Sequence, residues 1–171
     1  PHLGINALDA IITLFNTINA LRQQILPTDR VHGIITKGGE AANIIPDLAI
    51  ANFYVRSRNK KELDILLEKV LNCAKGAAIS SGTKLEIENY ETSFLDLVTN
   101  KTLMNLYEES LKDIGITEME DSEESGSTDA GDVSHVCATI HPYLPLYKEV
   151  TSHSRELAEC TIESGAYKGM E

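Results

Sequence analysis

Residues 30–56 constrain the fold of this chain more than any other stretch, because they combine two runs of strand character with a loop that contains glycine and proline. The stretch reads RVHGIITKGGEAANIIPDLAIANFYVR. In the second run, alternation along a strand places Phe53 and Val55 on one face and Tyr54 and Arg56 on the other. The stretch therefore predicts a strand, a loop and a second strand whose more polar face carries Arg56.

Three polar residues, His32, Asn43 and Arg56, stand out in this largely apolar stretch. Alternation along the first strand allows His32 to project from a face that does not belong to the core. On pattern alone, a hairpin that binds nothing, with a histidine at its rim and a solvated arginine, is the commoner explanation. A functional role for these residues therefore needs support from the rest of the chain.

Two amphipathic helices flank the predicted hairpin. Apolar residues recur at helical spacing over residues 6–25, and Pro27 ends this pattern. The apolar side chains of this helix are Leu8, Ile11, Ile12, Phe15, Ile18, Leu21 and Ile25. After the hairpin, Asn59 is a candidate N-cap with Glu62 as its reciprocal partner, and Gly82 stops the second helix.

Residues 84–90, KLEIENY, alternate in hydrophobicity and predict a third strand with Leu85 and Ile87 turned inward. The order helix, strand, strand, helix, strand predicts an α+β fold, a ferredoxin-like βαββαβ sandwich that lacks its first strand. Two helices cover only one face of so small a sheet. The remaining surface therefore either packs against a symmetric partner or is simply polar in a monomer.

The remainder of the chain, after a crossing segment at residues 92–99, predicts a second structural unit. Asn100 is a candidate N-cap of a helix that runs to Ile114. The acidic run at residues 118–129 is typical of a solvated loop, and it lacks the ligand spacing of an EF-hand for calcium. Residues 133–147 are apolar and β-branched with two prolines, and they predict a buried strand followed by an irregular loop.

The acidic composition excludes two classes of partner. With 15 Lys and Arg against 26 Asp and Glu the net charge is −11, whereas nucleic acid and anionic membranes require a basic surface. The three cysteines are widely spaced and form no C-x-x-C pair, which indicates reduced side chains in a cytoplasmic protein. The sequence contains no signal peptide and no apolar run of membrane-spanning length. Because the first residue is Pro1 and not methionine, we expect a fragment of a longer protein.

Four motifs carry a family resemblance. They are PHLGINALDA at the start, residues 30–56, the loop GSTDAGDVS and the segment TSHSREL near the end. In this order they resemble the M20 family of metallopeptidases and amidohydrolases, most closely its aminobenzoyl-glutamate hydrolase and aminoacylase-like branch. The resemblance implies that residues 1–92 are an inserted lid or dimerisation domain. It implies that residues 93–171 are the C-terminal part of a metal-dependent α/β catalytic domain whose N-terminal part is absent.

The same resemblance assigns roles to residues in the second half. Ser127, Thr128 and Asp129 match a loop that lines the active-site cleft and contacts substrate. The residues Ala130 and Asp132 depart from the methionine and asparagine of that family loop, which puts the substrate contacts of these two positions in doubt. The histidine of TSHSREL, His153, matches a ligand of a two-metal centre, so a divalent metal, as two zinc ions, is the expected cofactor of the intact protein.

The resemblance also implies functions for the polar residues of the hairpin. Arg56 offers a planar, permanently charged fork suited to a substrate carboxylate, and Asn43 can donate to an amide or carboxylate oxygen. His32 takes the role of a lid histidine that reaches the active site of the partner subunit and stabilises the tetrahedral oxyanion. The expected function is hydrolysis of the amide bond of an N-acyl amino acid or dipeptide-like substrate by a homodimer joined through the lid domains.

Two other interpretations compete with this one. A non-enzymatic βαββαβ dimerisation or small-ligand-sensing module needs only residues 1–92, and GSTDAGDVS and TSHSREL argue against it. A relative that keeps the fold without activity is the third possibility, supported by Ala130 and Asp132. In the family, most metal ligands and the general base precede Pro1, so we expect this fragment to be inactive alone.

Overall fold

The structure, a computed structural model, describes residues 2–120, 126–143, 150–151, 153–162 and 166. The chain divides into two compact units, one made of Pro1–Asp96 with Ser127–Asp132 and the other of Leu97–Gly126 with Val133–Glu171. In chain order the elements are α1 (Ala7–Leu21), η1 (Arg22–Gln24), β1 (Arg30–Lys37), β2 (Ile50–Arg56), α2 (Lys60–Ser81), α3 (Lys101–Asp113), α4 (Ala130–Ser134) and α5 (Arg155–Cys160). The predicted α+β class is confirmed.

The hairpin predicted from residues 30–56 is confirmed. Strands β1 and β2 pair antiparallel, with Val31 opposite Val55 and His32 opposite Tyr54. Because residues opposite each other in a ladder share a face, Val31 and Val55 lie on the core side and His32 and Tyr54 on the other side. The alternation in the sequence therefore assigned both faces correctly.

An aromatic ring explains the glycine in the middle of β1. Gly33 lies opposite Phe53, and a Cβ atom at Gly33 would come within 2.3 Å of the Phe53 ring. The ring of Phe53 in turn lies 5.0 Å, centroid to centroid, from the ring of Phe15 in α1. Any side chain at Gly33 would displace Phe53 from this contact with the helix.

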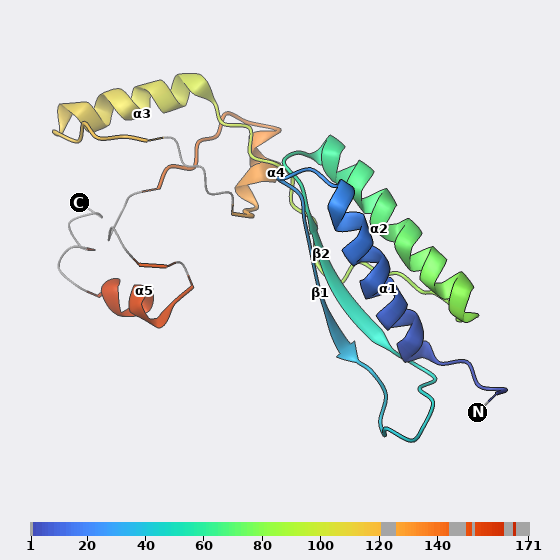
Figure 1. Cartoon of the computed structure of the whole chain (residues 1–171). Helices are drawn as coiled ribbons and strands as arrows, with labels where there is room; N and C mark the ends of the chain where they lie inside the picture. Colours follow the sequence, from blue (N-terminus) through green and yellow to red (C-terminus); the bar gives the residue numbers. More distant parts are fainter. Residues whose placement is uncertain (1, 121–125, 144–149, 152, 163–165, 167–171) are drawn as a thin grey trace. The chain divides into compact units, whose positions relative to one another are not determined.

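Helices α1 and α2 lie side by side on one face of the hairpin (Figure 1). The buried core formed between these elements consists of Leu14, Ile18, Val31, Leu66, Val70 and Ala77. Burying a side chain such as Ile18 or Leu66, both almost inaccessible, contributes about 1.5–3 kcal/mol to folding. The predicted apolar stripe of α1 is wrong at one position. Ile12 is 45% exposed, and Leu14 lies in the core instead.

The helix ends follow the predicted capping residues with one exception. Asn59 caps α2 by accepting from the Glu62 N–H at 3.0 Å, Asn100 caps α3, and Gly82 ends α2 with a φ of 71°. The reciprocal bond from Glu62 does not form, because its buried Oε2 has no hydrogen-bond partner among the described groups. Only half of the predicted capping box therefore exists.

The predicted strand at residues 84–90 is wrong. The described part of the chain contains a sheet of β1 and β2 alone, and residues 84–90 belong to no ladder. Leu85 and Ile87, expected to point inward, are 37% and 53% exposed. Alternating hydrophobicity makes a segment able to form a strand, but a strand also requires a neighbouring backbone to pair with.

The second unit contains α3 and α5, and the predicted strand at residues 133–147 is wrong there. Val133 lies in α4, and the Val133 carbonyl accepts from the N–H groups of Val136 and Cys137, so local turns replace a strand. Val136 is 85% exposed. The rest of that prediction, residues 144–147, and part of the acidic run, residues 121–125, lie outside the described residues.

Three general features complete the fold. Helix α3 has no buried residue. None of the helices in the described part of the chain combines the length and the apolar character that crossing a bilayer requires. The three cysteines, all of them described, are not joined by disulfides, as predicted.

Candidate functional site

The face of the hairpin that α1 and α2 leave uncovered brings together three side chains. His32 lies directly opposite Tyr54, and Arg56 lies two residues further along the same face. The Arg56 guanidinium carbon is 5.8 Å from the centroid of the Tyr54 ring, within cation–π distance. Two of the predicted site residues, His32 and Arg56, therefore flank Tyr54 on one exposed surface.

Tyr54 also contacts the segment that follows α2. Its hydroxyl donates a hydrogen bond to the Glu91 carboxylate, and the edge of its ring meets Tyr90 at a centroid distance of 5.8 Å. The hydrogen bond to Glu91, with a smaller contribution from the neighbouring Tyr90, raises the pKa of Tyr54 above its ordinary value. The phenol therefore remains a donor at neutral pH, and the ring has contacts that fix its position.

Arg56 has an uncommitted positive charge. Neither Arg56 nor Arg30, which lies opposite it, forms an ion pair with a described carboxylate. Arg30 donates instead to the carbonyl oxygens of Pro27 and Asp29, so its guanidinium is engaged by its own loop. Arg56 is therefore the guanidinium of this pair that is available to bind a carboxylate in a bidentate manner.

A buried carboxylate lies behind the end of this face. Asp29 is 5% exposed, and it accepts from the Leu26 N–H at 3.0 Å and from the Ser57 hydroxyl at 2.6 Å. Ser57 follows Arg56 directly, so Asp29 ties the end of β2 to the turn that precedes β1. This contact fixes the backbone from which Arg56 projects.

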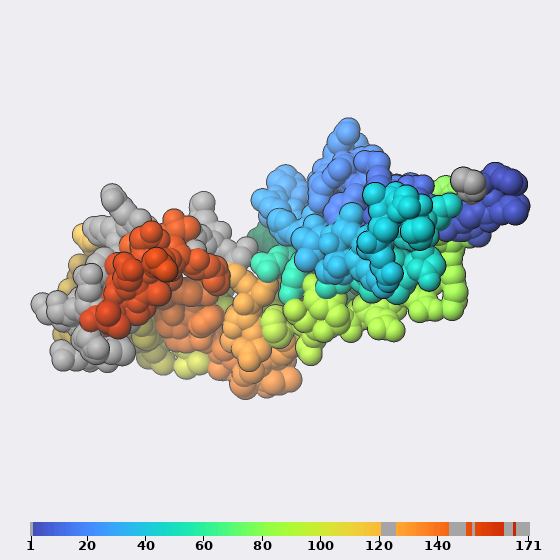
Figure 2. Space-filling model, turned by 90° about the horizontal axis from the view of Figure 1, so that it is seen from below, coloured from blue at the N-terminus to red at the C-terminus, as the bar shows by residue number. Residues whose placement is uncertain are grey.

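Asn43 lies in the loop between the strands and is exposed, and no hydrogen bond joins it to His32 or Arg56 among the described residues. The loop is anchored where the Ala7 N–H, at the start of α1, donates to the Pro46 carbonyl at 3.0 Å. In the space-filling view of Figure 2, the loop (cyan) lies at the surface beside the N-terminal residues (dark blue). The structure thus does not group Asn43 with the other two residues of the hairpin.

The motif GSTDAGDVS is only partly a loop, because its second half forms α4. Thr128 starts this turn, with its side chain accepting from the Ala130 N–H at 3.3 Å and its carbonyl from the Gly131 N–H at 3.2 Å. A Cβ atom at Gly131 would lie 2.0 Å from the Leu95 carbonyl oxygen. The backbone of this motif therefore packs closely against residue 95 of the same chain, and Ser127 and Asp129 remain exposed.

His153 precedes α5, and Ser154 caps that helix by accepting from the Leu157 N–H. The backbone of His153 has a φ of 62°, an unusual conformation for a non-glycine residue and one found more often at functional sites. Within the described ranges, no group of three His, Cys, Asp or Glu side chains is arranged to hold a metal ion. His153 by itself does not make a metal site.

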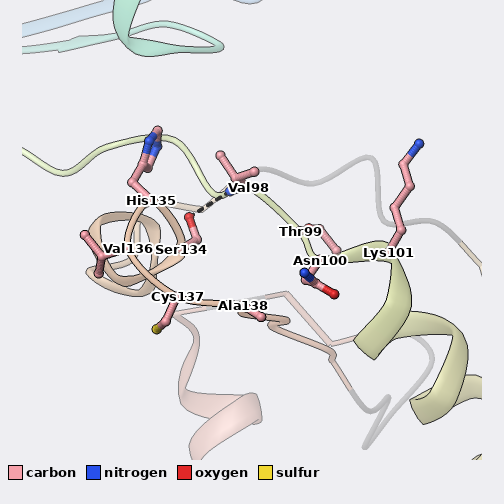
Figure 3. A pocket seen from close by; sticks show the side chains of 9 residues that line it. All are labelled: Val98, Thr99, Asn100, Lys101, Ser134, His135, Val136, Cys137 and Ala138. Atoms are coloured by element: carbon pink, nitrogen blue, oxygen red, sulfur yellow. Dashed lines mark hydrogen bonds between the residues drawn. The ribbon is translucent and has the colours of Figure 1, made fainter.

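A hollow in the second unit, lined by residues 98–101 and 134–138, holds a histidine and a cysteine (Figure 3). His135 and Cys137 point in different directions, so they do not form a nucleophile–base pair. The Ser134 hydroxyl accepts from the Val98 N–H at 2.8 Å and is used in holding the backbone. This hollow has no arrangement that supports catalysis.

Tyr54 and Asp29 belong to the site but were not predicted from the sequence pattern. Alternation placed Tyr54 on the same face as Arg56, but only the register shows that it lies opposite His32. Asp29 has no local signal, because its partner Ser57 is 28 residues away.

Comparison with known proteins identifies the first half of the chain and relates all of it to larger enzymes. Residues 1–81 match the M20 peptidase dimerisation domain. The chain is 37% identical over 170 residues to the Xaa-Arg dipeptidase of Mus musculus, covering 97% of this chain and 39% of the relative. Its identity to the Homo sapiens Xaa-Arg dipeptidase is 37% over 163 residues, covering 93% of this chain and 37% of the relative.

A bacterial relative supports the same relationship. The chain is 29% identical over 124 residues to one of the p-aminobenzoyl-glutamate hydrolase subunits of Escherichia coli (strain K12), which covers 72% of this chain and 26% of that relative. The chain spans about two fifths of the length of the two dipeptidases that it matches.

Proposed function

We propose, since the chain belongs to the M20 family of metallopeptidases and amidohydrolases, that it is part of a metal-dependent hydrolase. The substrate is an N-acyl amino acid or a dipeptide-like molecule with a free carboxylate, and the reaction is hydrolysis of its amide bond. Relatives named as a dipeptidase and as an aminobenzoyl-glutamate hydrolase support this substrate class, because both names describe an amide next to an amino acid.

In this proposal residues 1–92 form the lid or dimerisation domain, and residues 93–171 form the C-terminal part of the catalytic domain. The match over residues 1–81 and the two helices on one face of the hairpin support the first assignment. The lid is a ferredoxin-like βαββαβ sandwich in the intact protein. A homodimer forms through the lid domains of two copies.

The roles of the lid residues follow from their chemistry. Arg56 binds the substrate carboxylate, which its exposed and unpaired guanidinium supports. Asn43 donates to a substrate oxygen from its loop, and Ser127, Thr128 and Asp129 contribute further substrate contacts. His32 donates to the developing oxyanion in the active site of the partner subunit, and its exposure on the uncovered face of the hairpin is consistent with that role.

The metal centre requires residues beyond the described part of this chain. In this proposal His153 contributes one metal ligand. The described residues assemble no set of three ligands, so residues outside the described part of this chain contribute the others. A pair of zinc ions suits the family and would supply an activated water when bound. We place the protein in the cytoplasm, which the three cysteines without disulfides support.

The observation that carries the proposal is the exposed, uncommitted Arg56 on the same face as His32 in a domain that matches M20 dimerisation domains. The test is an assay of the full-length protein, loaded with zinc, on Xaa-Arg dipeptides, aminobenzoyl-glutamate and N-acetyl amino acids. Each substrate is paired with its C-terminal carboxamide. We expect hydrolysis of at least one acid and little hydrolysis of its amide, since the carboxamide cannot pair with a guanidinium.

The alternative is a non-enzymatic dimerisation or ligand-sensing module, for which the match of residues 1–81 to a dimerisation domain is the supporting observation. A full-length protein that forms a dimer and hydrolyses none of these substrates with any divalent metal would support this alternative.

A further inference from the structure

We propose that Tyr54 is a positioning residue for Arg56, holding its guanidinium in place to receive the substrate carboxylate. This inference rests on the proposed function of Arg56 and adds a residue to which no role has been assigned. Tyr54 itself does not touch the substrate in this proposal.

An arginine at the end of a strand has wide conformational freedom. Arg56 is the last residue of β2 and is exposed, and no described carboxylate or carbonyl accepts a hydrogen bond from it. A long side chain in this situation samples many rotamers, and ordering it on binding opposes affinity. A site that uses Arg56 gains from a neighbour that restricts it.

Tyr54 is placed to restrict the rotamers of Arg56. Residues two apart on a strand lie on the same face, and the Arg56 guanidinium carbon lies 5.8 Å from the Tyr54 ring centroid. A ring contact restrains the guanidinium through its π face and engages none of the N–H donors in a hydrogen bond. Those donors remain for a carboxylate.

The position of the Tyr54 ring is itself fixed by its neighbours. Its backbone is paired opposite His32 in the ladder, its hydroxyl donates to Glu91, and its ring edge meets Tyr90. The ladder and the contact with Tyr90 hold the ring, and the bond to Glu91 adds a third contact. A ring fixed in this way can restrain the guanidinium of Arg56. The contacts with Tyr90 and Glu91 also bring a segment 36 residues further along the chain into the support of the site.

A purely structural role for Tyr54, tethering residues 90 and 91 to the hairpin, is the competing explanation. The two roles differ in their dependence on Arg56. Support of the guanidinium disappears when the guanidinium is removed, whereas a tether acts with or without it.

A double-mutant cycle on the full-length protein separates these roles. Tyr54→Leu, Arg56→Ala and the double variant are assayed with a free-carboxylate substrate. An exposed cation–π contact corresponds to about a two- to five-fold change in affinity, so we expect Tyr54→Leu to raise KM by this factor with kcat unchanged. In the Arg56→Ala background the same substitution should leave KM unchanged. An equal rise of KM in both backgrounds overturns the inference.

Two further variants sharpen the test. Tyr54→Phe keeps the ring, its place in the ladder and its contact with Tyr90, and removes only the bond to Glu91, so it should recover most of the affinity that Tyr54→Leu loses. Failure of Phe to recover it assigns the effect to the tether and overturns the inference. Ile34→Thr is the matched control, because Ile34 is 63% exposed on the same face and belongs to no proposed contact with substrate.

Failure of the proposed function is distinguishable from failure of this inference. If the wild-type protein hydrolyses none of the substrates, the proposed function fails, and the cycle is measured as binding of an N-acetyl amino acid by calorimetry. Coupling between Tyr54 and Arg56 in that binding supports the inference without catalysis. Additive effects of the two substitutions, or no binding by the wild type, overturn it.

Discussion

The Ser57 hydroxyl donates a 2.6 Å hydrogen bond to the buried carboxylate of Asp29, which joins the end of β2 to the turn before β1. The other oxygen of Asp29 accepts from the Leu26 N–H at 3.0 Å. The end of the hairpin that carries Arg56 is thus held by a side chain, beyond the last pair of the ladder.

Asp29→Ala should lower the stability of the first unit. The substitution removes the charged acceptor of two part-buried donors, the Leu26 N–H and the Ser57 hydroxyl, which costs about 1–3 kcal/mol. Urea unfolding of the chain measures the free-energy change. Ser80→Ala, at an exposed serine of α2, is the control and should change stability by less than about 0.5 kcal/mol. Equal stability of Asp29→Ala and the control would contradict the role of Asp29.

His32→Ala should reduce kcat of the full-length protein by about 100- to 1000-fold, with a much smaller effect on KM. The physical reason is that an oxyanion donor interacts with the transition state and not with the substrate. Steady-state kinetics on a free-carboxylate substrate decides this. A rise in KM at constant kcat would assign His32 to substrate binding instead.

Action of His32 across the dimer can be isolated by mixing two inactive variants. A protein with His32→Ala is combined with a protein that carries His153→Ala, under conditions of proven subunit exchange. A heterodimer then contains one site with an intact metal ligand set and an intact histidine from its neighbour. Regained activity is the expected result, and its absence would exclude action in trans.

Arg56→Ala should raise KM for a free-carboxylate substrate by about tenfold or more, because charge-assisted hydrogen bonds to the carboxylate are lost. The carboxamide of the same substrate should show little change, since it does not pair with the guanidinium. Arg56→Lys keeps the charge and loses the bidentate geometry, so its KM for the free-carboxylate substrate should lie between those of the wild type and Arg56→Ala. Equal effects on acid and amide would show that Arg56 does not read the carboxylate.

His153→Ala should weaken metal binding by the full-length protein, as expected for loss of one ligand from a shared centre. The present chain, with no cluster of three candidate ligands in its described part, should bind zinc only weakly. Titration calorimetry measures both affinities. Tight stoichiometric binding of zinc by this chain would mean that the ligands lie elsewhere in it.

Residues 1–92 should exchange their amide hydrogens more slowly than residues 93–171. The first part contains the buried core around Ile18 and Leu66, whereas α3 buries no residue. Segments with few buried contacts open at low free-energy cost. Hydrogen exchange followed by mass spectrometry tests this, and equal protection in both halves would contradict it.

Much of the first unit could be predicted because its signals are local. The stripe around Ile18, the cap at Asn59 and the glycine at Gly82 each depend on residues within one or two helical turns. The faces of β2 likewise follow from alternation alone, so the exposure of Arg56 was predicted correctly. Local geometry repeats with a fixed period, and a period is readable in one sequence.

The failed strands mark the limit of such signals. Residues 84–90 alternate, and the run around Val133 is β-branched, yet neither forms a ladder in the described structure. A strand is stabilised by hydrogen bonds to a second backbone, which a one-segment pattern does not contain. Near Val133, local turn hydrogen bonds satisfy the backbone instead.

The sequence by itself determined the α+β class, the two helices, the hairpin and the outward position of His32 and Arg56, because these depend on periodicity and capping between near neighbours. Only the tertiary structure decided that Tyr54 bonds to Glu91, 37 residues further along the chain, and that Asp29 holds Ser57 across 28 residues. Such pairs depend on strand register and on where the chain returns. Those relationships arise from packing between distant segments, which no local pattern of residues specifies.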